Sequence, residues 1–166
     1  ENLVNGVSGA GPITHFDASK FKTQFACEVK GFNPNEHFDR KEARKMDLYT
    51  QYAIVAAKEA IEDAAMDLDK EDKTKIGVIY GVGIGGIRTF EEEMIAYAGV
   101  KDTIGPKFNP FFIPKMIADI ASGHISIMYG FHGPNFTTTS ACASSSNAIA
   151  DAFNYIRLGK ANVILA

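Results

Sequence analysis

The pattern of apolar and polar positions predicts helices that alternate with short strands. Residues 1–45, rich in Gly, Asn, Pro and Phe, show no sustained periodicity and are predicted to be irregular. Residues 46–66 have the spacing of an amphipathic helix. Its apolar positions include Leu48, Tyr52, Val55, Ile61 and several alanines. Residues 75–80 form an apolar run typical of a short buried strand, and a helix is expected to start at the acidic run 91–93.

The second half of the chain continues this alternation. A helix is predicted from Pro114 to Gly130, because glycine commonly ends helices, and a strand over residues 135–139. A further helix follows Cys142 and ends at Gly159, and an apolar strand closes the sequence. The resulting order α-β-α-α-β-α-β predicts a layered α/β domain.

The composition is typical of a globular protein and argues against some classes of binding partner. The 166 residues are 46% hydrophobic and 22% charged. A net charge of -3 argues against a general affinity for nucleic acid or anionic membranes. The sequence has no apolar run long enough to cross a bilayer and no signal-peptide pattern. Two cysteines are too few for a disulfide framework, so we expect a reducing, cytoplasmic location and a free thiol.

The two ends of the sequence suggest a piece of a longer protein. The first residue is Glu1, and the apolar run 162–166 stops without a turn or a polar cap. A buried parallel strand needs neighbours on both faces. We therefore expect truncation at both ends and part of any active site outside these residues.

Cys142 is the strongest candidate for a chemical role. It follows the β-branched run 137–139 and precedes a predicted helix, so it lies near a strand-to-helix turn. Unpaired N–H groups and the positive end of the helix favour a thiolate at such a turn. The flanking residues are Ala and Ser, as a tight nucleophile turn requires. The alternative is a small buried hydrophobic residue, the commonest role of a free cysteine.

Residues 81–86, GVGIGG, have the G-x-G-x-x-G spacing of a dinucleotide fingerprint. A Rossmann unit would also need a second strand closed by an acidic residue, whereas an acidic helix and a Pro/Phe-rich loop follow here. A glycine turn for close backbone packing is therefore favoured over a cofactor site. No His/Cys cluster has metal-ligand spacing, so neither cofactor nor metal is expected.

The four histidines do not mark a catalytic base. His124 falls on an apolar stripe formed by Ile117, Ile120 and Ile127, which favours a hydrogen-bonded core histidine over a catalytic one. The other three lie in a turn or in the irregular N-terminal region. They are His15, His37 and His132.

The run RKEARK at residues 40–45 concentrates positive charge in a mildly acidic chain. If it is helical, Lys41, Arg44 and Lys45 can share one face. Such a run is usually a solvated surface; the alternative is a docking surface for an anionic partner.

The string TTSACASSSNAI resembles the nucleophile segment of the β-ketoacyl-acyl-carrier-protein synthases, condensing enzymes of the thiolase superfamily. HFDASKFKTQFACEVKGFN, RKEARKMD, GVGIGG and NPFFIPKMIADIASGHISIMYG occur in the order found in the elongating synthases of type II. The resemblance implies a thiolase-like α/β/α/β/α fold, of which residues 1–166 are most of the N-terminal half. It also implies a homodimer and a C-terminal half that supplies two catalytic histidines and a lysine.

The resemblance assigns roles to individual residues. Cys142 corresponds to the nucleophile that accepts an acyl chain, with its own N–H in the oxyanion hole. Ile84 corresponds to the residue of the glycine turn that lines the acyl pocket, and Phe112 to the aromatic residue that reaches this pocket across the dimer. Lys41, Arg44 and Lys45 match the basic face that receives acyl carrier protein.

The implied reaction is a decarboxylative Claisen condensation of malonyl carrier protein with the acyl group on Cys142, which lengthens a fatty acid by two carbons. A polyketide ketosynthase and a non-catalytic α/β binding module remain alternatives. Ser140 stands where the family often has threonine, and residues 99–107 look longer than usual. These departures concern substrate preference. The sequence specifies neither the preferred length of the acyl chain nor the pathway, fatty acid or polyketide.

Overall fold

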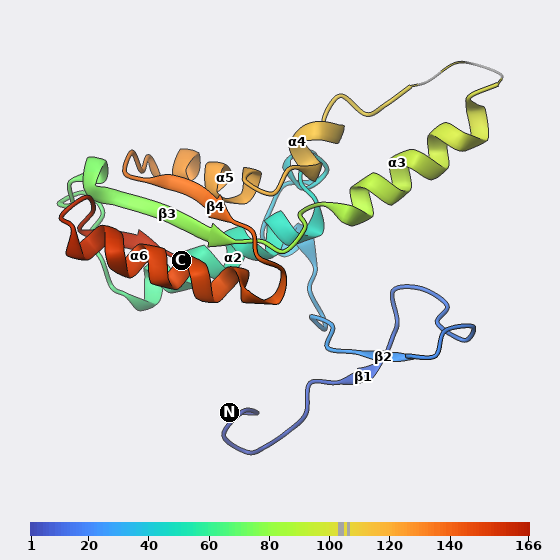
Figure 1. The fold of residues 1–166 in the computed structure, drawn as a ribbon, viewed down its shortest axis with the longest axis horizontal. Helices are drawn as coiled ribbons and strands as arrows, with labels where there is room; N and C mark the ends of the chain where they lie inside the picture. Colours follow the sequence, from blue (N-terminus) through green and yellow to red (C-terminus); the bar gives the residue numbers. More distant parts are fainter. Residues whose placement is uncertain (103–104, 106) are drawn as a thin grey trace. The chain divides into compact units, whose positions relative to one another are not determined.

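The computed structural model describes residues 1–102, 105 and 107–166, which form two units, Glu1–Asn33 and Pro34–Ala166. The longer segment expected at residues 99–107 lies partly outside the described residues. In the first unit, strands β1 (Gly11–Pro12) and β2 (Phe25–Ala26) pair antiparallel (Figure 1). The rest of this unit is loop and turn, as its composition predicts.

The second unit is built on a three-stranded parallel sheet in the order β4-β3-β5. Its strands are β3 (Ile76–Gly81), β4 (Asn135–Thr138) and β5 (Val163–Leu165). Val78 of the central strand is paired with Asn135 on one side and Leu165 on the other. The helices between these strands provide the crossovers that parallel pairing needs.

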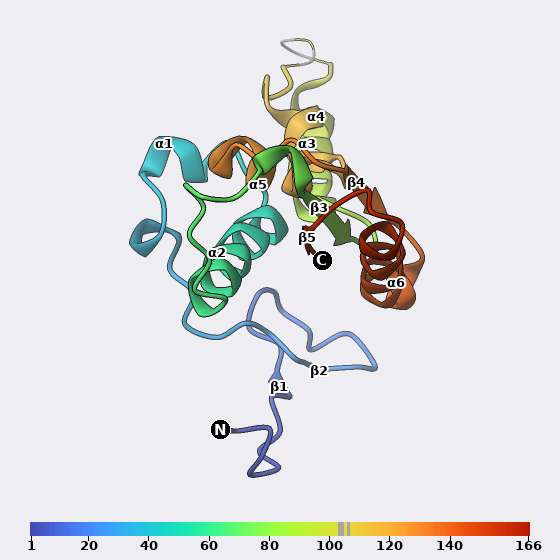
Figure 2. The same cartoon turned by 90° about the vertical axis from the view of Figure 1, so that its left-hand side faces the viewer.

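Helices cover both faces of this sheet (Figure 2). On one face α2 (Leu48–Asp63) and α5 (Ile120–Tyr129) pack around Ile76 and Val78. On the other face α6 (Ser144–Arg157) packs on Ile79. Alternate residues of β3 thus supply two separate apolar layers. The layered α/β architecture predicted from the sequence is confirmed.

The remaining elements connect this framework. They are η1 (Pro34–Glu36), α1 (Arg40–Ala43), η2 (Lys73–Lys75), α3 (Ile87–Val100), α4 (Phe112–Met116) and η3 (Ala141–Ala143). Helix α3 starts at Ile87, four residues before the acidic run at which it was expected. The single helix predicted from Pro114 to Gly130 is two helices, because Ile117 is extended, with ψ 141°. Gly130 does end α5 in the left-handed conformation, with φ 69°.

Small side chains form much of the buried surface of helices α2 and α6. Helix α6 contacts β3 through Ser144, Ala148 and Ala152, which lets the helix lie close to the sheet. Its large apolar residues Ile149, Phe153 and Ile156 instead remain exposed in this chain. Helix α2 likewise buries small and polar residues beside one larger aliphatic one: Thr50, Gln51, Ala53, Ile54 and Ala57.

The apolar stripe predicted around His124 is only partly buried. The buried residues of α5 are Ala121, Ser122 and Ile125, whereas Ile127 is 82% exposed. The prediction of a core stripe through Ile127 is therefore wrong, because the face of α5 toward the sheet is rotated from it. His124 is half-buried, and burial lowers the pKa of its imidazole.

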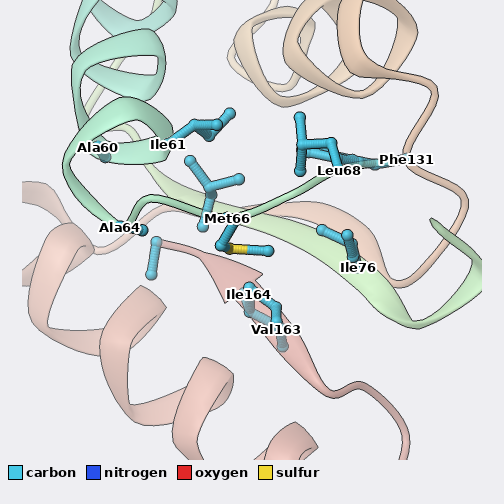
Figure 3. A pocket seen from close by; sticks show the side chains of 11 residues that line it. Ala60, Ile61, Ala64, Met66, Leu68, Ile76, Phe131, Val163 and Ile164 are labelled. Carbon is cyan, nitrogen blue, oxygen red and sulfur yellow. The ribbon is translucent and has the colours of Figure 1, made fainter. Parts of the chain in front are cut away.

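An apolar cavity of about 220 Å³ lies between the end of α2 and the strands β3 and β5 (Figure 3). Its wall is made mainly of aliphatic side chains, with one aromatic residue. They are Ala60, Ile61, Ala64, Met66, Leu68, Ile76, Phe131, Val163, Ile164, Leu165 and Ala166. Since none of these side chains can act as a nucleophile or an acid, the cavity carries no chemistry of its own.

Candidate active site

Cys142 lies in the turn that links the carboxyl end of β4 to α6. It is the central residue of the short helix η3, and α6 begins two residues later at Ser144. Its side chain is exposed and not in a disulfide. The alternative of a buried packing residue is therefore contradicted. Cys27, in the first unit, is also free and exposed, so exposure alone does not single out Cys142.

The backbone beside Cys142 is held in an unusual conformation. Ala141 has a φ of 50°, in the left-handed region that costs a residue with a Cβ about 1–2 kcal/mol. The hydroxyl of Ser144 donates to the Ala141 carbonyl at 2.7 Å and accepts the Ser140 N–H at 2.9 Å. Because Ser144 is buried, these two bonds fix the turn from inside the protein.

The end of β3 approaches the first turn of α6 so closely that only glycine fits. A Cβ on Gly81 would lie 2.5 Å from the Ser144 carbonyl carbon. The Thr138 hydroxyl donates to the Ser144 carbonyl at 2.9 Å. Two neighbouring strands thus hold the start of α6, and with it the turn that carries Cys142.

The segment 82–86, called here the glycine loop, follows β3 and lies beside the Cys142 turn. A Cβ on Gly83 would be 3.7 Å from the Ala141 carbonyl oxygen. Gly85, with φ 102°, has no room for a side chain against the Met116 carbonyl, and Gly86 has none against that of Lys115. The predicted role of these glycines, close backbone packing, is confirmed.

Ile84 is the one large side chain between Gly83 and Gly86, and it is 71% exposed. Together with Tyr49, Tyr52 and Tyr80 it lines an open depression next to the glycine loop. The structure thus brings Ile84 and Cys142 onto adjacent segments. Contact between the acyl chain and Ile84 stays a prediction.

Phe112 begins α4, the helix whose last residues contact the glycine loop. Its ring stacks on Phe108 at 5.6 Å and on Phe90 of α3 at 6.3 Å between ring centres. It is half-buried within this aromatic cluster. Its expected reach across a dimer stays a prediction.

The basic run begins with a short helix, α1, which ends at Ala43, so Lys41 lies in the helix and Arg44 and Lys45 lie in the turn after it. Lys41 and Arg44 are exposed. Lys45 instead donates to Glu42 at 2.6 Å, and its Nζ lies 5.9 Å from the Phe111 ring centre. Of the three predicted docking residues, Lys41 and Arg44 are therefore the two whose charge is most available to a partner.

Sequence reasoning missed the residues that support the site. Ser144 was treated only as one of several small residues, and nothing in the sequence distinguishes it from Ser145 or Ser146. Asp47 could have been found, because an aspartate just before an apolar helical pattern is a helix-capping signal. Its side chain accepts hydrogen bonds from both Tyr49 and Thr89, at the starts of α2 and α3.

Across the described ranges, no cluster of three or more His, Cys, Asp or Glu residues is placed to hold a metal ion. In the same part of the chain, no helix combines the length and apolarity needed to cross a membrane.

The described residues form a layered α/β unit in which an exposed cysteine lies in a strand-to-helix turn beside a glycine loop. The family model described as "Beta-ketoacyl synthase, N-terminal domain" matches residues 1–166. The chain belongs to this family.

Two similar curated proteins carry the same name. A 3-oxoacyl-[acyl-carrier-protein] synthase 2 of Staphylococcus aureus is 44% identical over 165 residues, covering 99% of this chain and 40% of that protein. The protein of the same name from Synechocystis is 41% identical, covering 99% of this chain and 39% of the relative. The chain thus spans about two fifths of the length of these relatives.

Two solved structures with a similar fold have titles that name ketosynthases. The ishigamide ketosynthase/chain length factor gives a TM-score of 0.80 at 25% identity, over 96% of this chain and 40% of that one. A type II polyketide ketosynthase, described in complex with its acyl-carrier protein, gives a TM-score of 0.72 at 26% identity. The match covers 80% of this chain and 38% of that one. The expected fold class, part of a ketosynthase α/β fold, is confirmed.

Proposed function

We propose that this chain is the nucleophile-bearing part of a β-ketoacyl-acyl-carrier-protein synthase that elongates fatty acids. The observation that carries the proposal is the exposed Cys142 thiol, fixed in a left-handed turn at the start of α6 and flanked by the glycine loop. The names of the relatives that are more than 40% identical support the same reaction.

In the first half-reaction the Cys142 thiolate attacks the carbonyl carbon of an acyl thioester on carrier protein. The S–C bond to Cys142 forms and the bond to the carrier sulfur breaks, so the carrier leaves as a thiol after taking up a proton. The developing oxyanion would be stabilised by backbone donors, among them the Cys142 N–H. A rigid turn serves this step because donors that are already oriented need no rearrangement.

In the second half-reaction malonyl carrier protein loses CO₂. The electron pair of the broken C–C bond forms a carbanion that attacks the acyl-Cys142 carbonyl. A new C–C bond forms, the thioester bond to Cys142 breaks, and a β-ketoacyl chain two carbons longer remains on the carrier. We assign assistance in decarboxylation to two histidines outside these 166 residues.

The remaining site residues take their proposed roles from this reaction. Ile84 would wall the acyl pocket, and Phe112 would reach the pocket of the partner in a homodimer. Lys41, Arg44 and Lys45 would attract the acidic carrier protein, with Lys41 and Arg44 the more exposed. No cofactor or metal is needed. A free nucleophilic thiol suits a reducing compartment, and we place the protein in the cytoplasm.

A polyketide ketosynthase is the second candidate, since both solved structures described above carry polyketide or ketosynthase titles. Their identities, 25% and 26%, are well below the 44% shared with the 3-oxoacyl synthase. We therefore favour fatty acid elongation.

The test uses the full-length protein that contains this chain, with acyl and malonyl carrier proteins as substrates. Cys142→Ala should abolish formation of the two-carbon-longer β-ketoacyl product, while Cys27→Ala, the matched control, keeps it. Product formation by Cys142→Ala equal to that by Cys27→Ala would contradict the role of Cys142, and a wild-type protein that forms no product would favour a non-catalytic module. A product that is extended repeatedly without reduction would favour a polyketide ketosynthase.

A further inference from the structure

A buried carboxylate joins the starts of two helices close to the glycine loop. Asp47 is 7% exposed, and its Oδ1 accepts the Tyr49 N–H of α2 at 3.3 Å. Its Oδ2 accepts the N–H and the hydroxyl of Thr89, in the first turn of α3, at 3.1 Å and 2.5 Å. Thr89 is also buried. Because helix N-termini attract negative charge, both helices stabilise this buried group.

These bonds supply a cap that α3 cannot make from its own sequence. Gly86 precedes α3 and has no side chain with which to bond the free N–H groups of the first turn. Asp47, more than 35 residues earlier in the chain, provides the missing acceptor. The pairing of Asp47 with Thr89, called here the clamp, therefore determines where α3 begins.

The clamp also lies against the glycine loop. A Cβ on Gly86 would be 3.1 Å from the Asp47 Oδ2. The Gly86 N–H donates to the Met116 carbonyl at 3.0 Å, and the Tyr49 hydroxyl donates to the neighbouring Ile117 carbonyl at 2.5 Å. The start of α2 thus holds both the loop and the segment on which the loop packs.

We propose that the clamp is a positioning device that sets acyl-chain selectivity by fixing the glycine loop, and with it Ile84, beside Cys142. This inference rests on the proposed function. A loop with glycines at 83, 85 and 86 has more backbone freedom than other sequences, so it needs anchors at both ends. Strand β3 anchors the first end, and the clamp anchors the second.

Thr89→Val tests the clamp, because valine matches threonine in shape but lacks the hydroxyl that donates to Asp47. Thr89→Ser keeps the hydroxyl and should restore wild-type behaviour. Thr74→Val is the matched control. Thr74 donates its N–H and hydroxyl to Asp72 at 3.0 Å and 2.6 Å, the same arrangement at an exposed site before β3.

Two quantities are measured in the full-length protein. The first is hydrogen exchange at the amides of residues 83–88, which needs no catalytic activity. The second is the ratio of long-chain to short-chain acylation of Cys142, followed by mass spectrometry. We expect Thr89→Val to raise loop exchange and to change the ratio by about tenfold, since small displacements at a reacting site have large kinetic effects. Thr89→Ser and Thr74→Val should leave both unchanged.

The outcomes separate this inference from the proposed function. If the wild-type protein acylates Cys142 and Thr89→Val alters neither quantity, the clamp proposal is overturned and the function stands. The same holds if Thr74→Val produces an equal change, because the effect would then be general destabilisation. A wild-type protein that takes up no acyl group on Cys142 overturns the proposed function and the selectivity role together.

Discussion

At the scale of single residues, the position of the Cys142 thiol depends on its neighbour in the turn. Ala141 adopts a left-handed conformation that an alanine avoids, and the Ser144 hydroxyl bonds to the two backbone groups that define it. Strained backbone at a nucleophile persists where the surroundings over-determine it. If Cys142 is the nucleophile, as we propose, Ser144 positions it for the reaction without touching the substrate.

Ser144→Ala removes both of these hydrogen bonds. We expect the rate of Cys142 acylation to fall about tenfold or more and the free energy of unfolding to fall by about 1–3 kcal/mol. Ser146→Ala, an equal change at an exposed position of the same helix, should alter neither. Acylation reactions quenched at timed intervals measure the rate, and chemical denaturation measures the free energy of unfolding. An acylation rate in Ser144→Ala equal to that of Ser146→Ala would show that the turn holds without this serine.

Ile84 offers a second prediction at this scale. If it walls the acyl pocket, Ile84→Phe adds bulk at the position of the distal methylenes, and each excluded methylene forfeits about 0.8 kcal/mol of burial. Long acyl chains should then lose transfer to Cys142 by a much larger factor than short ones. Ile127→Phe, on the exposed face of α5, is the control. A uniform loss over all chain lengths would instead indicate a damaged loop.

At the scale of elements, the end of α2 carries an avoidable strain. Ala65 follows the helix with a φ of 49°, a conformation in which glycine is preferred. Ala65→Gly should raise the free energy of unfolding by about 1 kcal/mol, the left-handed penalty less the entropy cost of glycine. The neighbouring Ala64 is right-handed, with φ -67°, so Ala64→Gly should lower it by about 0.5–1 kcal/mol. Thermal unfolding of both variants measures these changes. Destabilisation by Ala65→Gly would show that Ala65 is not strained.

The short helix α1 is the element proposed to meet the carrier protein. Reversing Lys41 and Arg44 to glutamate should raise KM for carrier-linked substrates by about tenfold and leave short pantetheine thioesters nearly unaffected, because the effect is electrostatic. Added salt should reduce the difference between variant and wild type. Reversal of Lys58 and Lys70, two exposed lysines outside α1, gives the same net charge as a control. Equal losses with both substrate types would mean that α1 is only structural.

Periodicity predicted the elements well where the sequence alone determines them. The strands at residues 76–81 and 135–138 and the helices α2 and α6 are where the pattern placed them. The break at Ile117 was missed, because the carbonyl of Met116 bonds to Gly86, a residue distant in sequence. The exposure of Ile127 was missed because spacing alone does not determine which helix face meets the sheet.

At the scale of the whole molecule, the candidate site is assembled from segments that the sequence keeps apart. Cys142 and the glycine loop could be identified from local motifs. Their contact through Ala141 and Gly83, and the capping of α3 by Asp47, depend on strand order and helix packing. The chain spans about two fifths of the length of its curated relatives, and the large apolar residues Ile149, Phe153 and Ile156 of α6 are exposed.

The most direct test of the account is to trap the covalent intermediate. The full-length protein is incubated with acyl carrier protein alone, digested, and mapped by mass spectrometry; malonyl carrier protein is then added to a second sample. We predict an acyl group on the Cys142 peptide and none on the Cys27 peptide. We also predict loss of that group, with formation of a β-ketoacyl product, after the malonyl substrate is added. An acyl group on another residue, or a Cys142 peptide that stays unmodified while product forms, would contradict the proposed function.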